Sequence, residues 1–328
     1  MSANYWVSTH HNHWVFPKDQ LASMRQKLEK ENSDLVQTFS LPETRHLYIY
    51  FNQQISRLSK RLKIRQQAIA TAQVYIKRFY IRVEIRRTNP YLVIATAVYL
   101  ACKIEECPQH IRLIVSEARS LWQDFISLDT SKLGECEFFL ISEMSSQLIV
   151  HQPYRTLTSL QTDLRISNED FALAWSIIND HYMTDLPLLY APHTIALTAI
   201  LLALVLRPNP PSSGGQVPGG ISSPQTPGSL PNAAAAVGAA AAALAQAQNR
   251  SLTPGGTPTP SDKEKPMEAK VGRVQRFVVW LADSDVDIAA MVDCTQEIIS
   301  FYNAQEQYND KLTREQISRF VKARGLDK

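Results

Sequence analysis

The sequence predicts an all-α protein with two sets of five helices, the second of which is interrupted by a disordered insert. Three observations support this prediction. Segments with apolar residues at helical spacing occupy most of the 328 residues. These segments fall into two sets of similar length. A stretch dominated by Pro, Gly, Ser and Ala, at residues 208–265, divides the second set.

The first set begins behind Ser40 and Glu43, which have the spacing of a helix capping box. Asn89 and Pro90 are typical of a helix start, and Pro108 is expected to end the helix that follows. The five predicted helices of this set span 43–61, 66–81, 91–106, 109–118 and 133–147.

The second set repeats this pattern, although few residues are identical between the two sets. Ser167 and Ser284 each begin an S-x-x-D sequence that is typical of a helix cap. The third helix of each set is apolar nearly all round, so we expect it to be central, with the other four helices packed around it. The five predicted helices of the second set span 153–164, 168–182, 191–206, 271–282 and 285–305.

The insert at 208–265 differs in composition from the rest of the chain. It contains no large aromatic residue, and no charged residue occurs between Arg207 and Arg250. Such a segment buries too little apolar surface to offset the entropy lost on ordering, so it is predicted to be disordered. Closing so long a loop costs only about 2 kcal/mol more than closing a short one, so a packed domain can contain it.

Composition and charge exclude several classes of protein. The net charge of +3 is too close to zero to identify a partner. Four cysteines are too few for a dense disulfide framework and suit a reducing compartment, the cytosol or the nucleus. The N-terminus lacks the charged start and apolar core of a signal peptide. No run of about 18 apolar residues predicts a membrane span.

Several segments resemble the cyclins, all-helical proteins that contain two five-helix cyclin boxes. The first box is matched by RQQAIATAQVYIKRFY, VIATAVYLACKIEEC and LGECEFFLISEM. The cyclin C subfamily is matched by ANYWVSTHHNHW, LIVHQPYRTL and AWSIINDHYMTDLPLLYAP. The resemblance covers about residues 3–206 and 271–305.

Together with the composition of the insert, this resemblance divides the chain into five parts, of which the insert and the C-terminal tail lie outside the resemblance itself. In cyclins of this type the N-terminal segment is linked to docking on the Mediator complex. The implied parts are the N-terminal segment 1–40, the first box 41–148, the second box 153–207 and 271–305, the insert 208–265, and a helical C-terminal tail 306–328.

The resemblance also implies a function without catalysis. Cyclin C-type proteins are regulatory subunits that bind and activate a cyclin-dependent kinase in the Mediator kinase module, in the nucleus. The partner kinase phosphorylates transcription factors and the C-terminal repeats of RNA polymerase II, which both represses and activates genes. The expected partners are that kinase, the other module subunits and, indirectly, RNA polymerase II. No cofactor and no metal are expected.

Two alternatives remain open. One is a cyclin for another transcriptional kinase. The other is a two-repeat factor like transcription factor IIB, which binds DNA and polymerase. Ten Lys/Arg against one acid between Arg57 and Arg87 are compatible with nucleic-acid phosphates, but a solvated face or an acidic protein partner is favoured, so direct nucleic-acid binding is not expected. The absence of the C-x-x-C pairs of a zinc ribbon argues against this factor.

Lys103 and Glu137 are the principal candidates for a binding site. Each is a charged residue on an otherwise apolar helical stripe. Their spacing alone favours an internal salt bridge between two helices. The resemblance implies that the pair also lies beside the kinase helix that cyclins hold, with Leu133, Leu140 and Met144 as apolar neighbours.

Two aromatic groups have both a binding and a packing interpretation. Trp6 and Trp14 precede the first box, where they are predicted either to dock on Mediator or to pack on the chain's own boxes. A second group matches a groove of the cyclin C subfamily, with core packing as the alternative; it consists of Trp175, Asn179, Asp180 and Asp185.

The remaining motifs are weaker. His10, His11 and His13 have no Cys or carboxylate neighbours in sequence, so a polar tail is favoured over a metal site. The acids at 283, 285 and 287 imitate the start of a calcium loop, but acids at a helix N-terminus explain them better. Five Ser/Thr-Pro steps in the insert are candidate phosphorylation sites: Ser223, Thr226, Thr253, Thr257 and Thr259.

Overall fold

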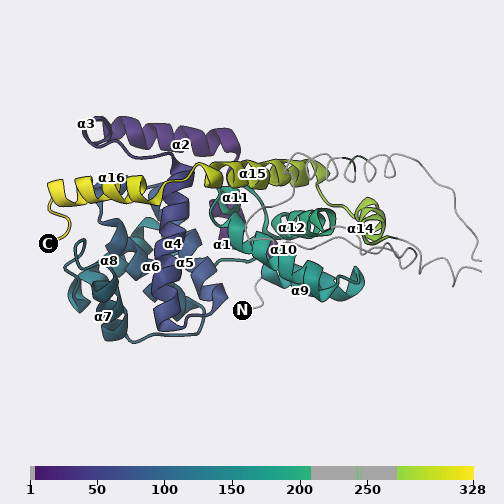
Figure 1. Cartoon of the computed structure of the whole chain (residues 1–328), viewed down its shortest axis with the longest axis horizontal. Coiled ribbons are helices and arrows are strands. Elements are labelled where there is room, and N and C mark those ends of the chain that lie inside the picture. Colours follow the sequence, from purple (N-terminus) through teal and green to yellow (C-terminus); the bar gives the residue numbers. More distant parts are fainter. Residues whose placement is uncertain (1–3, 208–241, 243–244, 246–271) are drawn as a thin grey trace, which may run out of the picture. The chain divides into compact units, whose positions relative to one another are not determined.

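The computed structural model describes residues 4–207 and 272–328, with Ala242 and Ala245, and every regular element among them is a helix (Figure 1). The all-α prediction is therefore confirmed for the described part of the chain. Apart from Ala242 and Ala245, the predicted insert lies outside the described residues, and so do its five Ser/Thr-Pro steps. None of the described helices is long and apolar enough to cross a membrane.

Packing divides the chain into two compact units. The first contains Met1–Gln152, Asn179–Pro192 and Ser300–Lys328, and the second contains Pro153–Ile178 and His193–Ile299. These units do not follow the predicted domain limits, so the limits of the two boxes stay predictions. Three helices have residues in both units: α10 (Asn168–His181), α15 (Ile288–Glu306) and α12 (Pro192–Leu206), of which only Pro192 belongs to the first unit.

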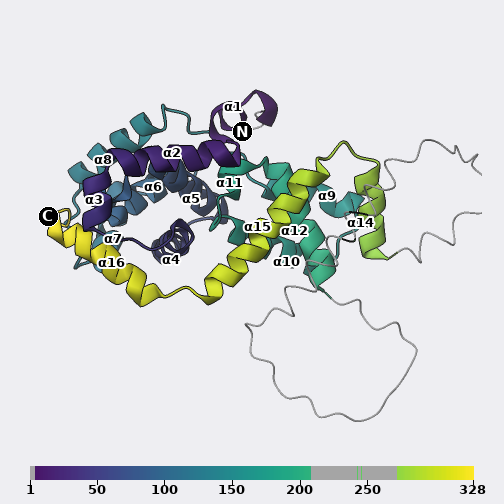
Figure 2. The same cartoon turned by 90° about the horizontal axis from the view of Figure 1, so that it is seen from above.

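The helices of the first unit include the five predicted for the first set and several others. Figure 2, which looks along α4, shows α2, α3 and α16 around it. In order, the helices are η1 (Tyr5–Val7), α1 (Thr9–Trp14), α2 (Lys18–Glu31), α3 (Ser33–Thr38), α4 (Thr44–Leu62), α5 (Gln66–Tyr80), η2 (Ile85–Arg87), α6 (Pro90–Ile104), α7 (Ile111–Leu121), α8 (Thr130–Glu143), α11 (Leu186–Leu189) and α16 (Asp310–Ala323).

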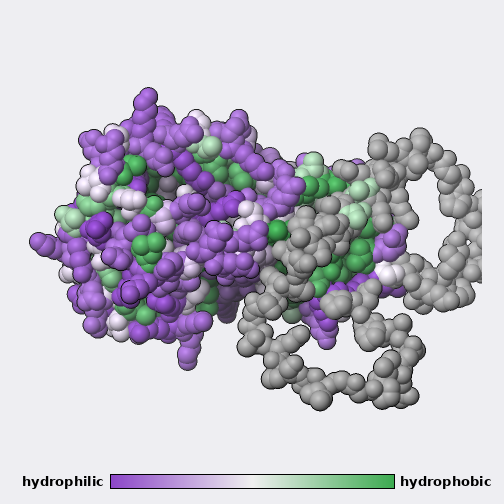
Figure 3. Space-filling model, turned by 45° about the horizontal axis from the view of Figure 1, so that its top comes forward, coloured by the Kyte–Doolittle hydropathy of each residue, from purple (hydrophilic) through white to green (hydrophobic). Residues whose placement is uncertain are grey.

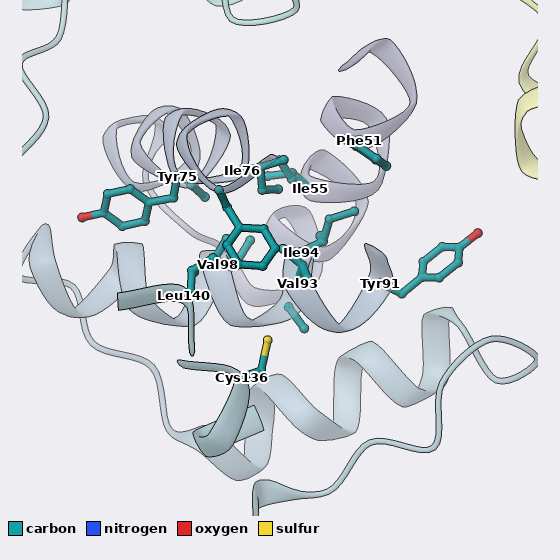
Figure 4. Packing of buried hydrophobic residues seen from close by; sticks show 14 of the residues in the cluster. Phe51, Ile55, Tyr75, Ile76, Tyr91, Val93, Ile94, Val98, Cys136 and Leu140 are labelled. Carbon is teal, nitrogen blue, oxygen red and sulfur yellow. The ribbon is translucent and has the colours of Figure 1, made fainter. Parts of the chain in front are cut away.

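The centre of the first unit is α6, as predicted for an evenly apolar helix. Its small residues Ala95, Ala97 and Ala101 are fully buried, which lets neighbouring helices approach closely. Larger side chains of α4, α5 and α8 then close around it. Figure 4 shows this packing with Phe51, Ile55, Tyr75, Ile76, Tyr91, Val93, Ile94, Val98, Cys136 and Leu140 labelled.

The start of α6 is also fixed as predicted. The side-chain oxygen of Asn89 accepts a hydrogen bond from the backbone N–H of Tyr91, at 3.0 Å. The amide nitrogen of Asn89 donates to the carbonyls of Phe125 and Leu326, at 2.7 and 2.9 Å. One side chain therefore caps the central helix and holds the C-terminal end of the chain against it.

The C-terminal helix α16 is part of the first unit's core. Ile317, Phe320 and Val321 are fully buried within it. The helical prediction for 306–328 was correct in type, but the segment packs as a core element and does not hang from the domain as a tail. The face drawn in Figure 3 is mostly hydrophilic over the first unit, with small apolar patches.

The second unit is arranged around α12, whose apolar side chains are buried on several sides. Its helices are α9 (Tyr154–Asp163), the first part of α10, α12 (Pro192–Leu206), α14 (Arg273–Ala282) and the first part of α15. The predicted cap at Ser167 is observed, because its hydroxyl accepts from the backbone N–H of Asp170 at 3.1 Å.

Two predicted caps were wrong. Glu43, and not Ser40, precedes the first residue of α4, and it makes no side-chain capping bond. Before α15 the cap is Asp287, which accepts from the backbone N–H of Ala290 at 3.0 Å, so Ser284 does not fill this position. In the second case Ser284 and Asp287 are both of capping type, and local spacing did not decide between them.

Candidate functional site

The two charged residues predicted to meet do lie together. Lys103 is in the last turn of α6, Glu137 is in α8, and the Lys103 ammonium forms an ion pair with Oε1 of Glu137. The ammonium also lies 4.7 Å from the centre of the Tyr99 ring, whose face attracts a cation. The predicted salt bridge is therefore present, while its part in binding a kinase stays a prediction.

The pair is unevenly exposed. The Lys103 side chain is 40% exposed, whereas that of Glu137 is 12% exposed. The mostly buried Glu137 carboxylate is paired with one cation, so it can still accept hydrogen bonds from a bound protein. A partner that covered the pair would also remove the water that screens it, and the attraction between the charges would increase.

The apolar neighbours differ from those predicted. Leu133, Leu140 and Met144 are fully buried, so they anchor α8 in the core and offer no surface to a partner. The exposed apolar residues are instead Phe138 and Phe139, at 76% and 41% exposure. Phe138 and Phe139 lie outside the helical stripe of buried residues, and that off-stripe position was the sequence signal for an exposed aromatic pair.

Local contacts hold both helices of the site in place. The N-terminus of α8 is capped by Asp129, which accepts from the backbone N–H of Lys132 at 2.8 Å. Just after α6, the carboxylate of Glu105 accepts from the Thr71 hydroxyl at 2.5 Å and from the Gln152 amide at 3.3 Å. The end of α6 that carries Lys103 is thus tied to α5 and to the segment after α8.

The N-terminal segment packs on the first unit. Trp14 is fully buried, with the guanidinium groups of Arg78 and Arg82 at 4.9 and 4.6 Å from its ring centre. His10 is also buried, and its Nδ1 accepts from the backbone N–H of His151 at 2.9 Å. Burial, followed by the charge of Arg78, lowers the pKa of His10 to about 3. For Trp14 the packing interpretation holds, and the polar-tail prediction was wrong for His10.

Trp6 differs from Trp14. It is 58% exposed, and the adjacent Val7 is 74% exposed. The centre of its ring lies 5.3 Å from that of Tyr5 and 5.3 Å from that of His11, and the Tyr5 and His11 rings are 5.2 Å apart. These contacts hold this part of the segment together. An aromatic and an aliphatic side chain are therefore presented side by side, so Trp6 remains the docking candidate of the segment.

The four residues predicted to form a groove fall in different units. In the second unit, Trp175 stacks against Tyr154, with ring centres 4.4 Å apart. In the first unit, Asp180 accepts from the Tyr302 hydroxyl at 3.0 Å, and burial raises the pKa of Asp180 to about 6 despite this bond. Their shared role as a groove stays a prediction.

The other two members of this group have internal partners in the first unit. The side-chain oxygen of Asn179 accepts from Gln66 at 3.1 Å. Asp185 forms a two-pronged ion pair with Arg25, at 2.8 and 2.5 Å. Burial raises the pKa of Asp185, but the bonds and charge of Arg25 outweigh it and leave the pKa lowered.

The basic stretch is not one continuous charged surface. Lys77, Arg78 and Arg86 are buried. Lys77 lies 3.2 Å from the centre of the Tyr48 ring, and burial lowers its pKa to about 7. Arg78 donates to the carbonyls of Gln147 and Ile149, at 2.8 and 3.2 Å. The exposed members at the end of α4 are Arg57, Lys60, Arg61, Lys63 and Arg65, whereas the exposed Arg82 and Arg87 follow α5.

The weaker motifs give no metal site. Among the described residues, no three or more His, Cys, Asp or Glu side chains are grouped closely enough to hold a metal ion. Asp287 acts as a helix cap, in agreement with the acid-at-N-terminus interpretation of the 283–287 acids. A cavity of about 390 Å³ lies between α2, α4 and η2, away from the Lys103–Glu137 pair.

The fold is that of a cyclin. Residues 18–149 match the family model described as cyclin, N-terminal domain. Among solved structures, the fold is similar to a chain of the CAK complex of Chaetomium thermophilum bound to ATP-γ-S, with 19% identity, a TM-score of 0.58, and coverage of 97% of this chain and 87% of that one. It is also similar to a chain of the yeast TFIIK complex, with 20% identity, a TM-score of 0.52, and coverage of 60% and 85%.

Full-length relatives define the type of cyclin. An RNA polymerase II holoenzyme cyclin-like subunit of Gibberella moniliformis is 64% identical over 100% of both chains. A protein of the same name from Neurospora crassa is 60% identical over 100% of both. The chain belongs to this family, the cyclin C-type RNA polymerase II holoenzyme cyclin-like subunits, as its sequence motifs had predicted.

Proposed function

We propose that this chain binds and activates a cyclin-dependent kinase through a surface formed by Lys103, Glu137 and Phe138. The observation that carries the proposal is the combination of an ion pair with a mostly buried carboxylate and a neighbouring aromatic ring that is 76% exposed. Binding interfaces concentrate their affinity in such aromatic anchors, and a charged pair at the edge sets the register. The membership in the cyclin-like subunits and the fold likeness to chains of kinase complexes support it.

The proposed mechanism is a shift in the conformation of the kinase. A protein kinase is active when the lysine of its strand β3 pairs with a glutamate on its αC helix. A cyclin surface that packs better against the inward position of that helix increases the population of the active conformation. In this proposal Phe138 supplies apolar contact area, and the Lys103–Glu137 pair supplies a donor and an acceptor that fix the position of the helix. The cyclin chain itself performs no chemistry.

The proposed partner is the kinase of the Mediator kinase module, acting in the nucleus. The relatives are named as subunits of the RNA polymerase II holoenzyme, which agrees with a kinase that phosphorylates the C-terminal repeats of that polymerase, in repression as well as in activation. The exposed pair Trp6 and Val7 is the proposed contact of the N-terminal segment with other subunits of the module.

A single substitution tests the kinase-binding surface. Glu137→Ala is expected to weaken binding of the purified kinase at least tenfold and to lower its activation, measured by biolayer interferometry and by phosphorylation of a C-terminal repeat peptide. Glu135→Ala is the matched control, because Glu135 is an exposed acid on the same helix. Circular dichroism must show both variants helical. Unchanged kinase binding by a folded Glu137→Ala protein would remove this role.

The identity of the partner needs a second experiment. Affinity purification of the tagged chain from nuclear extract, followed by mass spectrometry, is expected to recover the kinase and the other Mediator kinase-module subunits. Recovery of another transcriptional kinase alone would favour a different cyclin assignment. Recovery of polymerase initiation factors, with no kinase, would instead favour the transcription factor IIB-like alternative.

A further inference from the structure

A pocket in the second unit is lined by four arginines. It has a volume of about 310 Å³ and lies where the start of α10, the end of α12 and the start of α14 meet. Two acids and one serine complete its wall. We call it the arginine pocket; its residues are Arg165, Ser167, Glu169, Asp170, Arg207, Arg273 and Arg276.

Asp170 is the structural centre of this pocket. Its side chain is 2% exposed, and both of its oxygens accept from Nη1 of Arg273, at 2.9 and 3.1 Å. Arg207 lies 3.3 Å from the same carboxylate, and the Ser167 hydroxyl donates to it at 2.8 Å. The Asp170 carboxylate is thereby bonded on both oxygens. It holds two guanidinium groups in fixed positions, which prepares them for a further ligand.

The balance of charge in the pocket favours an anion. Four guanidinium groups face two carboxylates, those of Glu169 and Asp170, so the lining carries an excess of two positive charges. Glu169 is itself paired with Arg207. In addition, α10 is a 14-residue helix whose N-terminal end opens at Ser167, where the helix dipole adds positive potential.

A phosphate monoester fits these features better than a carboxylate does. It carries nearly two negative charges at neutral pH and three strong acceptor oxygens. The planar fork of arginine matches pairs of phosphate oxygens, and several arginines around one phosphate are the usual way in which proteins bind a phosphorylated side chain. A carboxylate brings one charge and two oxygens, which would leave part of the excess charge unbalanced.

We propose that the arginine pocket binds the phosphate group of a phosphorylated serine or threonine. Two sources can supply this group. One is the chain itself, because residues 208–271 begin directly after Arg207, end two residues before Arg273, and contain all five Ser/Thr-Pro steps. The other is a separate phosphoprotein. The proposal does not depend on the kinase-binding surface, which lies in the first unit.

The test uses the full chain, free of phosphate, and a fluorescent peptide of residues 220–230 phosphorylated on Thr226. The phosphopeptide is expected to bind at least tenfold more tightly than the unphosphorylated peptide, with an affinity that falls as salt is added. The double variant Arg165→Gln, Arg276→Gln is expected to weaken binding about ten- to a hundredfold, as two charged donors are lost. Arg155→Gln, an exposed arginine of the same unit, should bind like the unaltered chain.

Two results would overturn the proposal. One is equal binding of the phosphorylated and unphosphorylated peptides. The other is an unchanged affinity in a double variant whose helical content and melting temperature are normal. If the double variant does not fold, the single variant Arg165→Gln decides, because Arg165 is exposed and its replacement leaves the Asp170 bonds intact.

A second arm identifies the source of the phosphate. The chain is phosphorylated by a proline-directed kinase and then offered the same labelled phosphopeptide. If the chain's own segment fills the pocket, peptide binding falls at least tenfold, and alanine at the five Ser/Thr-Pro positions restores it. If the phosphorylated chain binds the peptide as before, the pocket receives its phosphate from another molecule.

Discussion

The central helices α6 and α12 end in similar ways but in different surroundings. Lys103 lies in the last turn of α6 and pairs with Glu137 of α8, and Arg207 follows α12 and pairs with two acids of α10. The residue that follows Glu137 in α8 is Phe138, whose ring is exposed. Beside the second lie three more arginines. The same helical arrangement therefore supports a surface for a protein in one unit and a pocket for an anion in the other, and the flanking residues make the difference.

The acids of the two pairs also differ in burial, since Asp170 is 2% exposed and Glu137 is 12% exposed. Removal of Asp170 should therefore have the largest effect on folding stability. Asp170→Ala leaves Arg207 and Arg273 facing each other without their shared carboxylate, so a loss of about 3–5 kcal/mol of unfolding free energy is expected in urea denaturation. Glu169→Ala is the matched control, because Glu169 is 75% exposed, and it should change stability by less than about 0.5 kcal/mol. Equal losses for both acids would contradict the ranking by burial.

The second prediction gives the first unit a pH dependence of its own. Because burial raises the pKa of Asp180 to about 6, the folded protein binds this proton more tightly than the unfolded chain does. Wild-type stability should therefore fall by about 2–3 kcal/mol between pH 4 and pH 6, and stay at the lower value above pH 6.

Asp180→Asn removes this titration and keeps an oxygen to accept from Tyr302. The variant is expected to be more stable than wild type at pH 7 and nearly equal to it at pH 4, in urea unfolding at both values. If wild type and variant lose the same stability between pH 4 and pH 7, another group is responsible.

The third prediction concerns the aromatic ring that distinguishes the first pair from the second. Phe138→Ala should cost about 2 kcal/mol of kinase affinity, roughly thirtyfold, with less than about 0.5 kcal/mol of folding stability, because the ring is 76% exposed. Phe139→Ala is the comparison. The centre of the Phe139 ring lies 5.3 Å from that of Phe79, so this substitution should lower folding stability more than Phe138→Ala does. A Phe138→Ala protein with full affinity would place the interface elsewhere.

The smallest predicted effect is the loss of folding stability when Lys103, the cation of the first pair, is replaced. Lys103→Met should lower the unfolding free energy by about 1 kcal/mol or less, because a 40% exposed ammonium is screened by water. Thermal melts measure this change, with Lys132→Met of α8 as a control for the added methionine. A loss as large as that of Asp170→Ala would show that the two pairs are equivalent in stability after all.

Local signals in the sequence predicted most of the helices. The Asn89–Pro90 start of α6 was correct because a side-chain cap and a proline act within one turn. The prediction of 66–81 for α5 differs from the observed Gln66–Tyr80 by one residue. The Lys103–Glu137 contact was also predictable, since each is a lone charge on an apolar stripe that must meet a neighbouring helix.

Other features depend on long-range contacts that no local pattern contains. Trp14 is buried in the core of the first unit, where Arg78 and Arg82, more than 60 residues away in sequence, lie against its ring. The arginine pocket brings Arg165 and Arg273 together from positions more than 100 residues apart, so sequence spacing gave no sign of it.

One bond in the second unit has a practical consequence. Nη2 of Arg273 donates to the backbone carbonyl of Arg207 at 2.5 Å, which ties the residue that follows α12 to the first residue of α14. The spacing of these two points is therefore set by folded residues, whatever length of polypeptide joins them. A fluorescent protein placed between them would leave both helices undisturbed, and the chain could be followed in living cells without a tag at either terminus.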